Sequence, residues 1–409
     1  MGTTIRPDSA EAILEAVAWA AASDTPLEII GHGSRRAIGA PMNTEHTIDL
    51  THMTGVTLYE PDELVLSARA GTPMSEITKL LRDNNQDLAF EPPDPSRLLG
   101  GYRGRGTIGG VLASNMSGPR RIKAGAVRDH ILGVHAISGR GEMFKSGGRV
   151  VKNVTGYDLS KVMAGSWGTL AVVTELTMKV LPRPEYVSTL VIAGMSDEAG
   201  VKALCAAMGS PWDVSGAAHV PDSVVSEIPD AAFAAGGRAV TLLRLEGFEP
   251  SIAYRAERLK AMFRQKGEVT VLGATSSEPL WRAIRDVEPF RTQEEAVWRI
   301  SVAPMEGPKV IAALRPKITP FRHFYDWSGG LVWLEVGDAA EDAHATRIRQ
   351  TIRMHGGGHA MLIRGSPALR SSVPVFEPQP LALTDLSRRL KEQFDPKGIL
   401  NPGRMGMRA

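Results

Sequence analysis

Pro26-Leu-Glu-Ile-Ile-Gly-His-Gly-Ser34 is the stretch of sequence that decides the fold. Its first five residues predict a short apolar strand, and Gly31 and Gly33 allow the chain to turn sharply where that strand ends. Because glycine carries no Cβ, the backbone N–H groups of such a turn can converge on a phosphate. The stretch therefore predicts a phosphate-binding turn, with an ordinary tight turn as the alternative.

Two common nucleotide-binding motifs are absent from this turn. The dinucleotide fingerprint G-x-G-x-x-G requires glycine at position 36, where the chain has Arg36. A P-loop requires Gly-Lys-Ser or Gly-Lys-Thr, and neither follows. A phosphate bound here would belong to another class of nucleotide-binding fold.

Further glycine loops follow along the chain. Thr107-Ile-Gly-Gly-Val-Leu-Ala-Ser-Asn-Met-Ser-Gly118 places small residues where a long, partly polar ligand can lie against the backbone, and Gly165-Ser-Trp-Gly168 precedes an apolar run. Separate glycine loops imply a ligand larger than one phosphate. The alternative is unrelated turns in a chain with 42 glycines among 409 residues.

Composition excludes several classes of protein. The 47 basic and 45 acidic residues nearly balance, which argues against nucleic-acid binding. A single cysteine, Cys205, excludes an internal disulfide, a Cys-ligated iron–sulfur cluster and a multi-cysteine zinc site. No basic-then-apolar leader or long apolar run is present, so we expect a cytoplasmic protein that reaches a membrane only through partners.

The pattern of elements predicts an α+β protein with three segments. Prolines 182 and 184 mark the first boundary, and we expect a domain over 1–184, a second α+β domain over 185–376 with helices on one sheet face, and a C-terminal segment over 377–409. Residues 91–125 read as one long proline- and glycine-rich loop. Strands are predicted over 26–30, 47–50, 55–59, 64–70, 130–138, 141–145, 169–181, 186–192, 239–245, 330–336 and 359–364. Helices are predicted near 8–22, 73–81, 157–164, 197–208, 252–266, 340–355 and 381–393.

Several motifs together resemble the vanillyl-alcohol-oxidase, or PCMH-type, family of FAD flavoproteins. They are Gly31-His-Gly-Ser34, Glu91-Pro-Pro-Asp94, Thr107-Ile-Gly-Gly110, Ala126-Val-Arg-Asp129, Lys152-Asn-Val-Thr-Gly-Tyr-Asp158, Gly168-Thr-Leu-Ala-Val-Val-Thr-Glu175 and Phe394-Asp-Pro-Lys-Gly-Ile-Leu-Asn-Pro-Gly-Arg404. The resemblance implies an FAD-binding domain of two α+β subdomains and an α+β cap domain with an antiparallel sheet.

The resemblance also implies which residues bind FAD. The turn Gly31, His32, Gly33 and Ser34, closed by Gly39, would surround the pyrophosphate. The remaining cofactor-binding candidates are Pro92, Pro93, Thr107, Gly109, Gly110, Asn115, Ser117, Gly118, Gly125, Val127, Val172, Val173 and Asn401, the last with Pro402 and Gly403 in a C-terminal return.

Two departures from the family pattern carry predictions. Members that bind FAD covalently have histidine directly before the loop serine, where this chain has Gly33, so we expect noncovalent FAD. Relatives that oxidise 2-hydroxy acids with metal assistance carry H-x-G-D-G-x-x-H, whereas this chain offers only His355-Gly-Gly-Gly-His359. Glycines disfavour the helix that would place both histidines on one face, so no metal is expected.

Charged and aromatic residues supply weaker candidates. Arg120, Arg121, Lys123 and Lys152 are cations that could stabilise a reduced flavin, with a solvated basic face as the alternative. Catalytic residues remain unknown; Arg285, near Arg282 and Arg291, and the aromatic-rich pair His323 and Tyr325 are the candidates, with surface or core roles as alternatives.

Motifs for FAD binding without metal ligands or clustered cysteines favour a reaction that is divided among several subunits. The resemblance implies an electron-transferring subunit that works with a homologous flavoprotein and an iron–sulfur subunit on a small 2-hydroxy acid. The alternatives are a self-sufficient FAD-dependent oxidase or dehydrogenase of a 2-hydroxy acid or aldonolactone, and a scaffold that no longer binds FAD.

Overall fold

The computed structural model describes residues 3–150, 156–228, 230–231, 235–291, 294–337 and 341–406. The chain divides into two compact units: Met1–Ser117, Gly125–Arg183 and Pro374–Ala409 form the first, and Gly118–Ala124 with Pro184–Val373 form the second. The sequence-based division kept residues 118–124 in the first domain, whereas in the structure they pack with the second unit.

The first unit contains two main sheets and a short one. A parallel sheet has the order β1-β3-β2, an antiparallel sheet has the order β4-β5-β9-β7-β8, and β6 pairs with β10. The strands are β1 (Thr3–Ile5), β2 (Leu27–Ile30), β3 (His46–Asp49), β4 (Val56–Glu60), β5 (Val65–Arg69), β6 (Gln86–Asp87), β7 (Ile131–Ser138), β8 (Met143–Gly147), β9 (Ala171–Lys179) and β10 (Leu181–Pro182). The helices are α1 (Ala10–Ala22), α2 (Met74–Asp83), α3 (Ile108–Ser114), α5 (Val127–His130), α6 (Leu159–Met163) and α15 (Leu381–Phe394).

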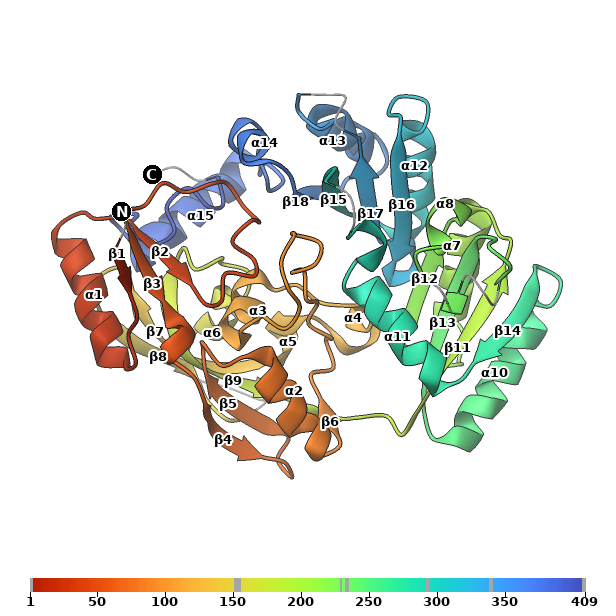
Figure 1. Ribbon diagram of the computed structural model, residues 1–409, viewed down its shortest axis with the longest axis horizontal. Coiled ribbons are helices and arrows are strands. Elements are labelled where there is room, and N and C mark those ends of the chain that lie inside the picture. Colours follow the sequence, from red (N-terminus) through yellow and green to blue (C-terminus); the bar gives the residue numbers. More distant parts are fainter. Residues whose placement is uncertain are drawn as a thin grey trace. The chain divides into compact units, whose positions relative to one another are not determined.

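Both ends of the chain build the core of the first unit. Helix α1 begins after Ser9, whose Oγ accepts a hydrogen bond from Ala12 N, and it buries Ile13 and Val17 at helical spacing. Near the C-terminus, Leu390 and Phe394 of α15 pack against the same core. Figure 1 shows α15, in blue, beside the red and orange N-terminal elements.

The second unit is built on one eight-stranded antiparallel sheet with the order β14-β11-β13-β12-β16-β17-β15-β18. Its strands are β11 (Tyr186–Ala193), β12 (Gly216–Val220), β13 (Val240–Gly247), β14 (Glu268–Leu272), β15 (Ala296–Ser301), β16 (Phe321–Asp326), β17 (Leu331–Val336) and β18 (His359–Arg364). Its helices are α4 (Arg121–Ala124), α7 (Asp197–Met208), α8 (Asp222–Val225), α10 (Glu249–Phe263), α11 (Ala274–Arg285), α12 (Gly307–Leu314), α13 (Ala345–Met354) and α14 (Pro367–Ser372). Figure 1 shows α10 and α11 beside β11 and β14.

The structure confirms the α+β fold and corrects the prediction for residues 91–125. That segment is not one loop, because it contains α3 and α4. Helix α3 forms despite two glycines since Thr107 Oγ1 accepts a hydrogen bond from Gly110 N at 3.2 Å and caps its first turn. Four described strands of the second unit were also missed, β12, β14, β15 and β16, and so were the helices α8, α11, α12 and α14.

Candidate functional site

A pocket in the first unit lies where β2 ends. It encloses about 480 Å³ of empty space, counting its open mouth. Its lining comes from the turn after β2, the start of α3, the third glycine loop and the C-terminal return: Ile29, Ile30, Gly31, His32, Gly33, Ser34, Arg35, Arg36, Thr107, Gly110, Ala113, Trp167, Asn401 and Arg404. The lining therefore unites all the glycine loops that the sequence singled out.

The predicted phosphate turn leaves its backbone donors open. Within the described residues, the N–H groups of His32, Gly33 and Ser34 form no hydrogen bond. Gly33 has a φ of +71°, and a Cβ there would meet nothing within 4 Å. The buried Nδ1 of His32 also has no partner among the described residues. Open donors facing a pocket fit an acceptor-rich ligand such as a phosphate.

Gly31 is required by a close approach to α3. A Cβ at this position would lie 2.6 Å from Thr107 Oγ1, so only glycine lets the turn touch the cap of that helix. Gly109, in the first turn of α3, also makes a close contact. Its N–H donates to Ala70 O at 2.8 Å, and a Cβ would lie 2.7 Å from that oxygen. Both glycines thus fix the distance between the two loops.

Arg35 is the central cation of the pocket. Its Nη2 donates to the Pro93 carbonyl at 3.0 Å, and its Nη1 lies 3.4 Å from Ser34 Oγ. Its Nε is buried and has no hydrogen-bond partner among the described residues. Burial lowers the pKa of Arg35 to about 10, although the nearby Asp94 opposes this shift. A buried guanidinium with an open donor has the chemistry to bind an anion.

The two other arginines of the lining have different partners. Arg36 forms a bidentate pair with Glu28, with distances of 2.8 and 2.5 Å. Arg404 donates to the Arg35 carbonyl at 2.7 Å, and its guanidinium lies 5.7 Å from the centroid of the Trp167 ring. The described lining residues include no carboxylate, so the pocket is positively charged.

Asn401 holds the C-terminal return against the pocket. Its Oδ1 accepts a hydrogen bond from Ile29 N and its Nδ2 donates to Trp167 O, each at 2.8 Å. The residue is almost fully buried and has a φ of +42°. Gly39 closes the turn beside the same return, because Ala40 N donates to the Arg404 carbonyl at 3.0 Å.

The other predicted cofactor residues lie around the pocket or apart from it. Pro93 lies next to the pocket, because its carbonyl accepts the hydrogen bond from Arg35, and Pro92 is its neighbour in the chain. Asn115 caps the end of α3 and accepts from Arg128 N at 3.0 Å, and Ser117 accepts from Val127 N at 3.2 Å. These four and Gly125 belong to the first unit outside the lining, as do Val172 and Val173, whose register pairs them with β7. Gly118 belongs to the second unit.

Arg35, Arg404 and Trp167 were not among the candidate cofactor-binding residues. Each lines the pocket beside a motif that was singled out, at Gly31–Ser34, Asn401–Gly403 and Gly165–Gly168. For the two arginines the sequence held a signal, because Arg35 directly follows the phosphate turn and Arg404 directly follows Gly403 of the C-terminal return. Lys152 and residues 151–155 of its motif lie outside the described residues.

The catalytic candidates His323 and Tyr325 join a buried cluster in the second unit. His323 Nε2 lies 2.8 Å from Asp197 Oδ2, and the Tyr325 hydroxyl donates to the same oxygen at 3.1 Å. His219 and Arg315 approach this carboxylate at 3.4 and 3.5 Å. Burial opposes ionisation of Asp197, but the nearby His219 and the hydrogen bond with His323 outweigh it, so the pKa of Asp197 lies far below its usual value.

The remaining cap candidates are also engaged. Arg285 forms a bidentate pair with the neighbouring Asp286 at 2.8 and 2.9 Å. His355 follows α13 and His359 begins β18, on either side of a glycine turn. Across the described ranges, no three His, Cys, Asp or Glu side chains gather as a metal-binding group.

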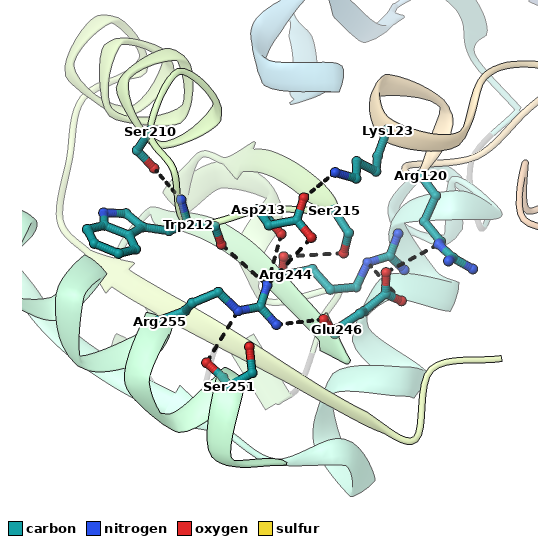
Figure 2. A network of polar contacts seen from close by, with 10 residues as sticks. All are labelled: Arg120, Lys123, Ser210, Trp212, Asp213, Ser215, Arg244, Glu246, Ser251 and Arg255. Carbon is teal, nitrogen blue, oxygen red and sulfur yellow. Dashed lines mark hydrogen bonds and ion pairs between the residues drawn. The ribbon is translucent and has the colours of Figure 1, made fainter. Parts of the chain in front are cut away.

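The segment 118–124 is fastened to the second unit by charged pairs. Arg120 contacts Glu246 at 3.2 Å, and Lys123 pairs with Asp213 (Figure 2). Arg255 also contacts Glu246, because its Nη2 donates to the Glu246 carbonyl at 2.7 Å. Two of the cations proposed for a flavin, Arg120 and Lys123, therefore hold this segment in place.

Comparisons with known proteins agree with this geometry. The FAD binding domain family matches residues 3–147, and the family described as FAD linked oxidases, C-terminal domain, matches residues 380–405. The chain is 34% identical to glycolate oxidase subunit GlcE of Escherichia coli (strain K12) over 97% of both chains. It is 25% identical to glycolate oxidase subunit GlcD of Bacillus subtilis (strain 168) over 87% of this chain and 78% of that one.

Solved structures show the same fold at low sequence identity. p-Cresol methylhydroxylase matches with a TM-score of 0.76 and 12% identity, covering 99% of this chain and 88% of that one. 4-Ethylphenol oxidase from Gulosibacter chungangensis matches with a TM-score of 0.72 and 14% identity, covering 99% and 89%. Among the described helices, none combines the length and apolar character needed to cross a membrane.

Proposed function

Because the chain belongs to the family of FAD-linked oxidases that includes glycolate oxidase subunit GlcE, we propose that it is the FAD-binding, electron-transferring component of a glycolate oxidase (dehydrogenase) complex, equivalent to GlcE. The complex would oxidise glycolate or D-lactate-type 2-hydroxy acids to 2-oxo acids. A homologous flavoprotein D subunit and an iron–sulfur F subunit would be its partners.

One observation carries the cofactor assignment. The pocket after β2 combines three arginines, open backbone donors and no carboxylate among its described lining residues. Arg35 and His32 each keep a buried nitrogen without a partner in the described chain. A diphosphate would accept hydrogen bonds from these groups and neutralise the buried charge, so the residues present fit the diphosphate of FAD.

The chain's own residues then have distinct tasks. The turn Gly31–Ser34 and Arg35 would bind the diphosphate, while Thr107 and Gly110 would line the path beside it. Asn401 positions the turn through Ile29 and the third glycine loop through Trp167. When bound, FAD supplies the acceptor for two electrons, which no side chain of this protein provides.

We propose that FAD is bound without a covalent link. Gly33 replaces the histidine that precedes the loop serine in covalent relatives, and a glycine offers no atom for a bond to the flavin. His32 stands one position earlier in the pocket-lining turn.

The proposed partners follow from what the chain does not carry. Its single cysteine, Cys205, cannot ligate an iron–sulfur cluster that passes electrons onward. The described residues also provide no metal group of the kind that assists oxidation of 2-hydroxy acids. We infer that onward electron transfer takes place in other chains, and any membrane association would come through them.

The test is an absorption spectrum of the chain purified alone, before and after acid precipitation, followed by anaerobic addition of glycolate and D-lactate. We expect a flavin spectrum, release of the colour by acid, and no bleaching until the D and F subunits are added. Colour retained by the precipitate would contradict noncovalent binding. Bleaching of the isolated chain would make it a self-sufficient dehydrogenase, and a colourless chain that rejects FAD would contradict the proposal altogether.

A further inference from the structure

Lys391, in the last turn of α15, joins two segments of the first unit that are far apart in the sequence. Its Nζ donates to Asp395 Oδ2 at 2.5 Å and to Leu400 O at 3.3 Å, in the turn that leads into the C-terminal return. It also donates to Thr169 O at 2.6 Å, directly after the third glycine loop and 222 residues earlier in the chain. An ammonium group has three donors, so these contacts use all of them.

Asp395 provides the opposite charge. Its side chain is completely buried, and the Lys391 side chain is only 17% exposed. The Asp395 carboxylate also accepts hydrogen bonds from Ile399 N at 3.1 Å and from Leu400 N at 2.8 Å. The ion pair and these two hydrogen bonds therefore fix the backbone directly before Asn401.

The burial of this ion pair sets Lys391 apart from the other lysines. The side chains of the other lysines that form ion pairs within the described chain are 38–79% exposed. Burying two charges costs desolvation energy that an exposed pair avoids. A pair buried in this way is better suited to specify one arrangement of the segments it joins than to add stability.

Thr169 connects the ammonium group to the pocket. The Thr169 hydroxyl and N–H donate to Ser166 O at 2.7 and 3.0 Å, so Thr169 closes the third glycine loop. Trp167 of this loop lines the pocket, and its carbonyl accepts the hydrogen bond from Asn401. Lys391 is not among the described lining residues, so it acts on the loop through the Thr169 backbone.

We propose that Lys391, paired with Asp395, is a positioning residue for the cofactor pocket. Its ammonium group holds the third glycine loop where Trp167 forms part of the lining, and it holds the turn that leads into Asn401. The inference rests on the proposed function for the identity of the ligand, FAD. Without the ammonium group, the loop and the C-terminal return separate more readily and bound FAD dissociates faster.

The test compares FAD binding with local opening of the loop. Lys391→Met keeps an unbranched side chain and removes the three donors. We expect FAD affinity to fall at least about tenfold, mainly through faster dissociation. In the chain without FAD, we expect faster hydrogen exchange of the backbone amides of residues 165–170 and 395–404. The matched control is Lys397→Met, which removes an exposed ion pair with Asp24 and should change FAD affinity less than about twofold.

A second control separates positioning from a general loss of stability. Ser67→Ala removes a buried hydrogen bond to Thr177 in the antiparallel sheet of the same unit. We expect this variant to lower the Tm without accelerating FAD dissociation. Should Lys391→Met fail to fold, Lys391→Gln, which keeps an amide donor, undergoes the same measurements, and faster FAD dissociation is again expected.

Three outcomes would overturn the inference. They are unchanged FAD dissociation in the Lys391 variant, unchanged hydrogen exchange of residues 165–170, and FAD dissociation rates that follow the Tm of every variant, Ser67→Ala included. A wild-type chain that rejects FAD contradicts the proposed function. Hydrogen exchange of the FAD-free chain then decides the inference alone, because faster exchange in the Lys391 variant supports it and unchanged exchange refutes it.

Discussion

The Asn401 side chain accepts a hydrogen bond from the backbone of Ile29, 372 residues earlier in the chain, at 2.8 Å. The same amide donates to Trp167, so one buried side chain joins the strand before the phosphate turn, the third glycine loop and the C-terminal return. The pocket therefore depends on a contact that neither end of the chain can make alone.

Replacing Asn401 by glycine should destabilise the first unit and weaken FAD binding. Glycine tolerates the positive φ, so the variant removes only the two hydrogen bonds and leaves buried groups unsatisfied, at a cost of about 2–4 kcal/mol. Urea unfolding and FAD titration measure both effects. The control is Asn84→Gly, an exposed residue at the end of α2, which should change unfolding by less than about 1 kcal/mol and leave FAD affinity intact. Equal effects of the two variants would contradict the role of Asn401.

Arg35→Met should weaken FAD binding by about 10- to 100-fold, because a charge-assisted hydrogen bond to a phosphate is lost. Affinity for riboflavin, which carries no phosphate, should not change. Arg36→Met is the matched control from the same turn: its guanidinium is already paired with Glu28, so we expect a smaller loss. Both ligands are titrated by flavin fluorescence. An equal loss for FAD and riboflavin would show that Arg35 supports the fold rather than the diphosphate.

Asp197→Asn should lower the stability of the second unit in a pH-dependent way. The folded-state pKa of Asp197 is depressed, so its charge contributes stability above the unfolded-state pKa of about 3.9, and this contribution is lost as the pH falls toward the folded value. The difference in unfolding free energy between wild type and variant should therefore be full at pH 6–7 and shrink below about pH 4. Denaturant unfolding across this range, with the exposed Asp222→Asn as control, measures this pH dependence. A difference in unfolding free energy that stays constant with pH would contradict the prediction.

Glu246→Gln should expose residues 118–124 to trypsin. The Arg120–Glu246 pair is mostly buried, with side-chain exposures of 14% and 11%, whereas the side chains of the Lys123–Asp213 pair are 51% and 54% exposed. Partly buried pairs contribute more than exposed ones, which are worth about 0–1 kcal/mol. Cleavage in this segment should accelerate in Glu246→Gln and change little in Asp213→Asn. Mass spectrometry of the fragments measures the rates, and the reverse order would refute the ranking.

Local signals predicted the parts of the fold that depend on neighbouring residues. The Ser9 cap, the apolar spacing of α1 and the strand that ends at Gly31 are all visible within a few residues, and the structure confirms them. The glycine-rich segment 91–125 was misread because glycine content outweighed the Thr107 cap. Strands such as β12 were missed, since they are short and contain small residues that carry no clear alternation.

Long-range contacts limit how much of the candidate site can be predicted from the sequence. The sequence singled out the turn, the third glycine loop and the C-terminal return, but the meeting of Arg35 and Arg404 requires the return to fold back beside β2. Likewise, the sequence offered His323 and Tyr325 as catalytic candidates, with core roles as the alternative. Their environment depends on Asp197, which stands more than 120 residues away at the start of α7.

The pairing of Leu27 with the C-terminal return has a consequence for biosynthesis. Leu27 N donates to Ile399 O, and Asn401 N donates to Leu27 O, so β2 gains its second neighbour only when residues 399–401 have left the ribosome. The second unit, in contrast, is complete once Val373 has emerged. During translation the cap would therefore fold before the FAD unit closes, and a nascent chain stalled before residue 399 should not retain the flavin.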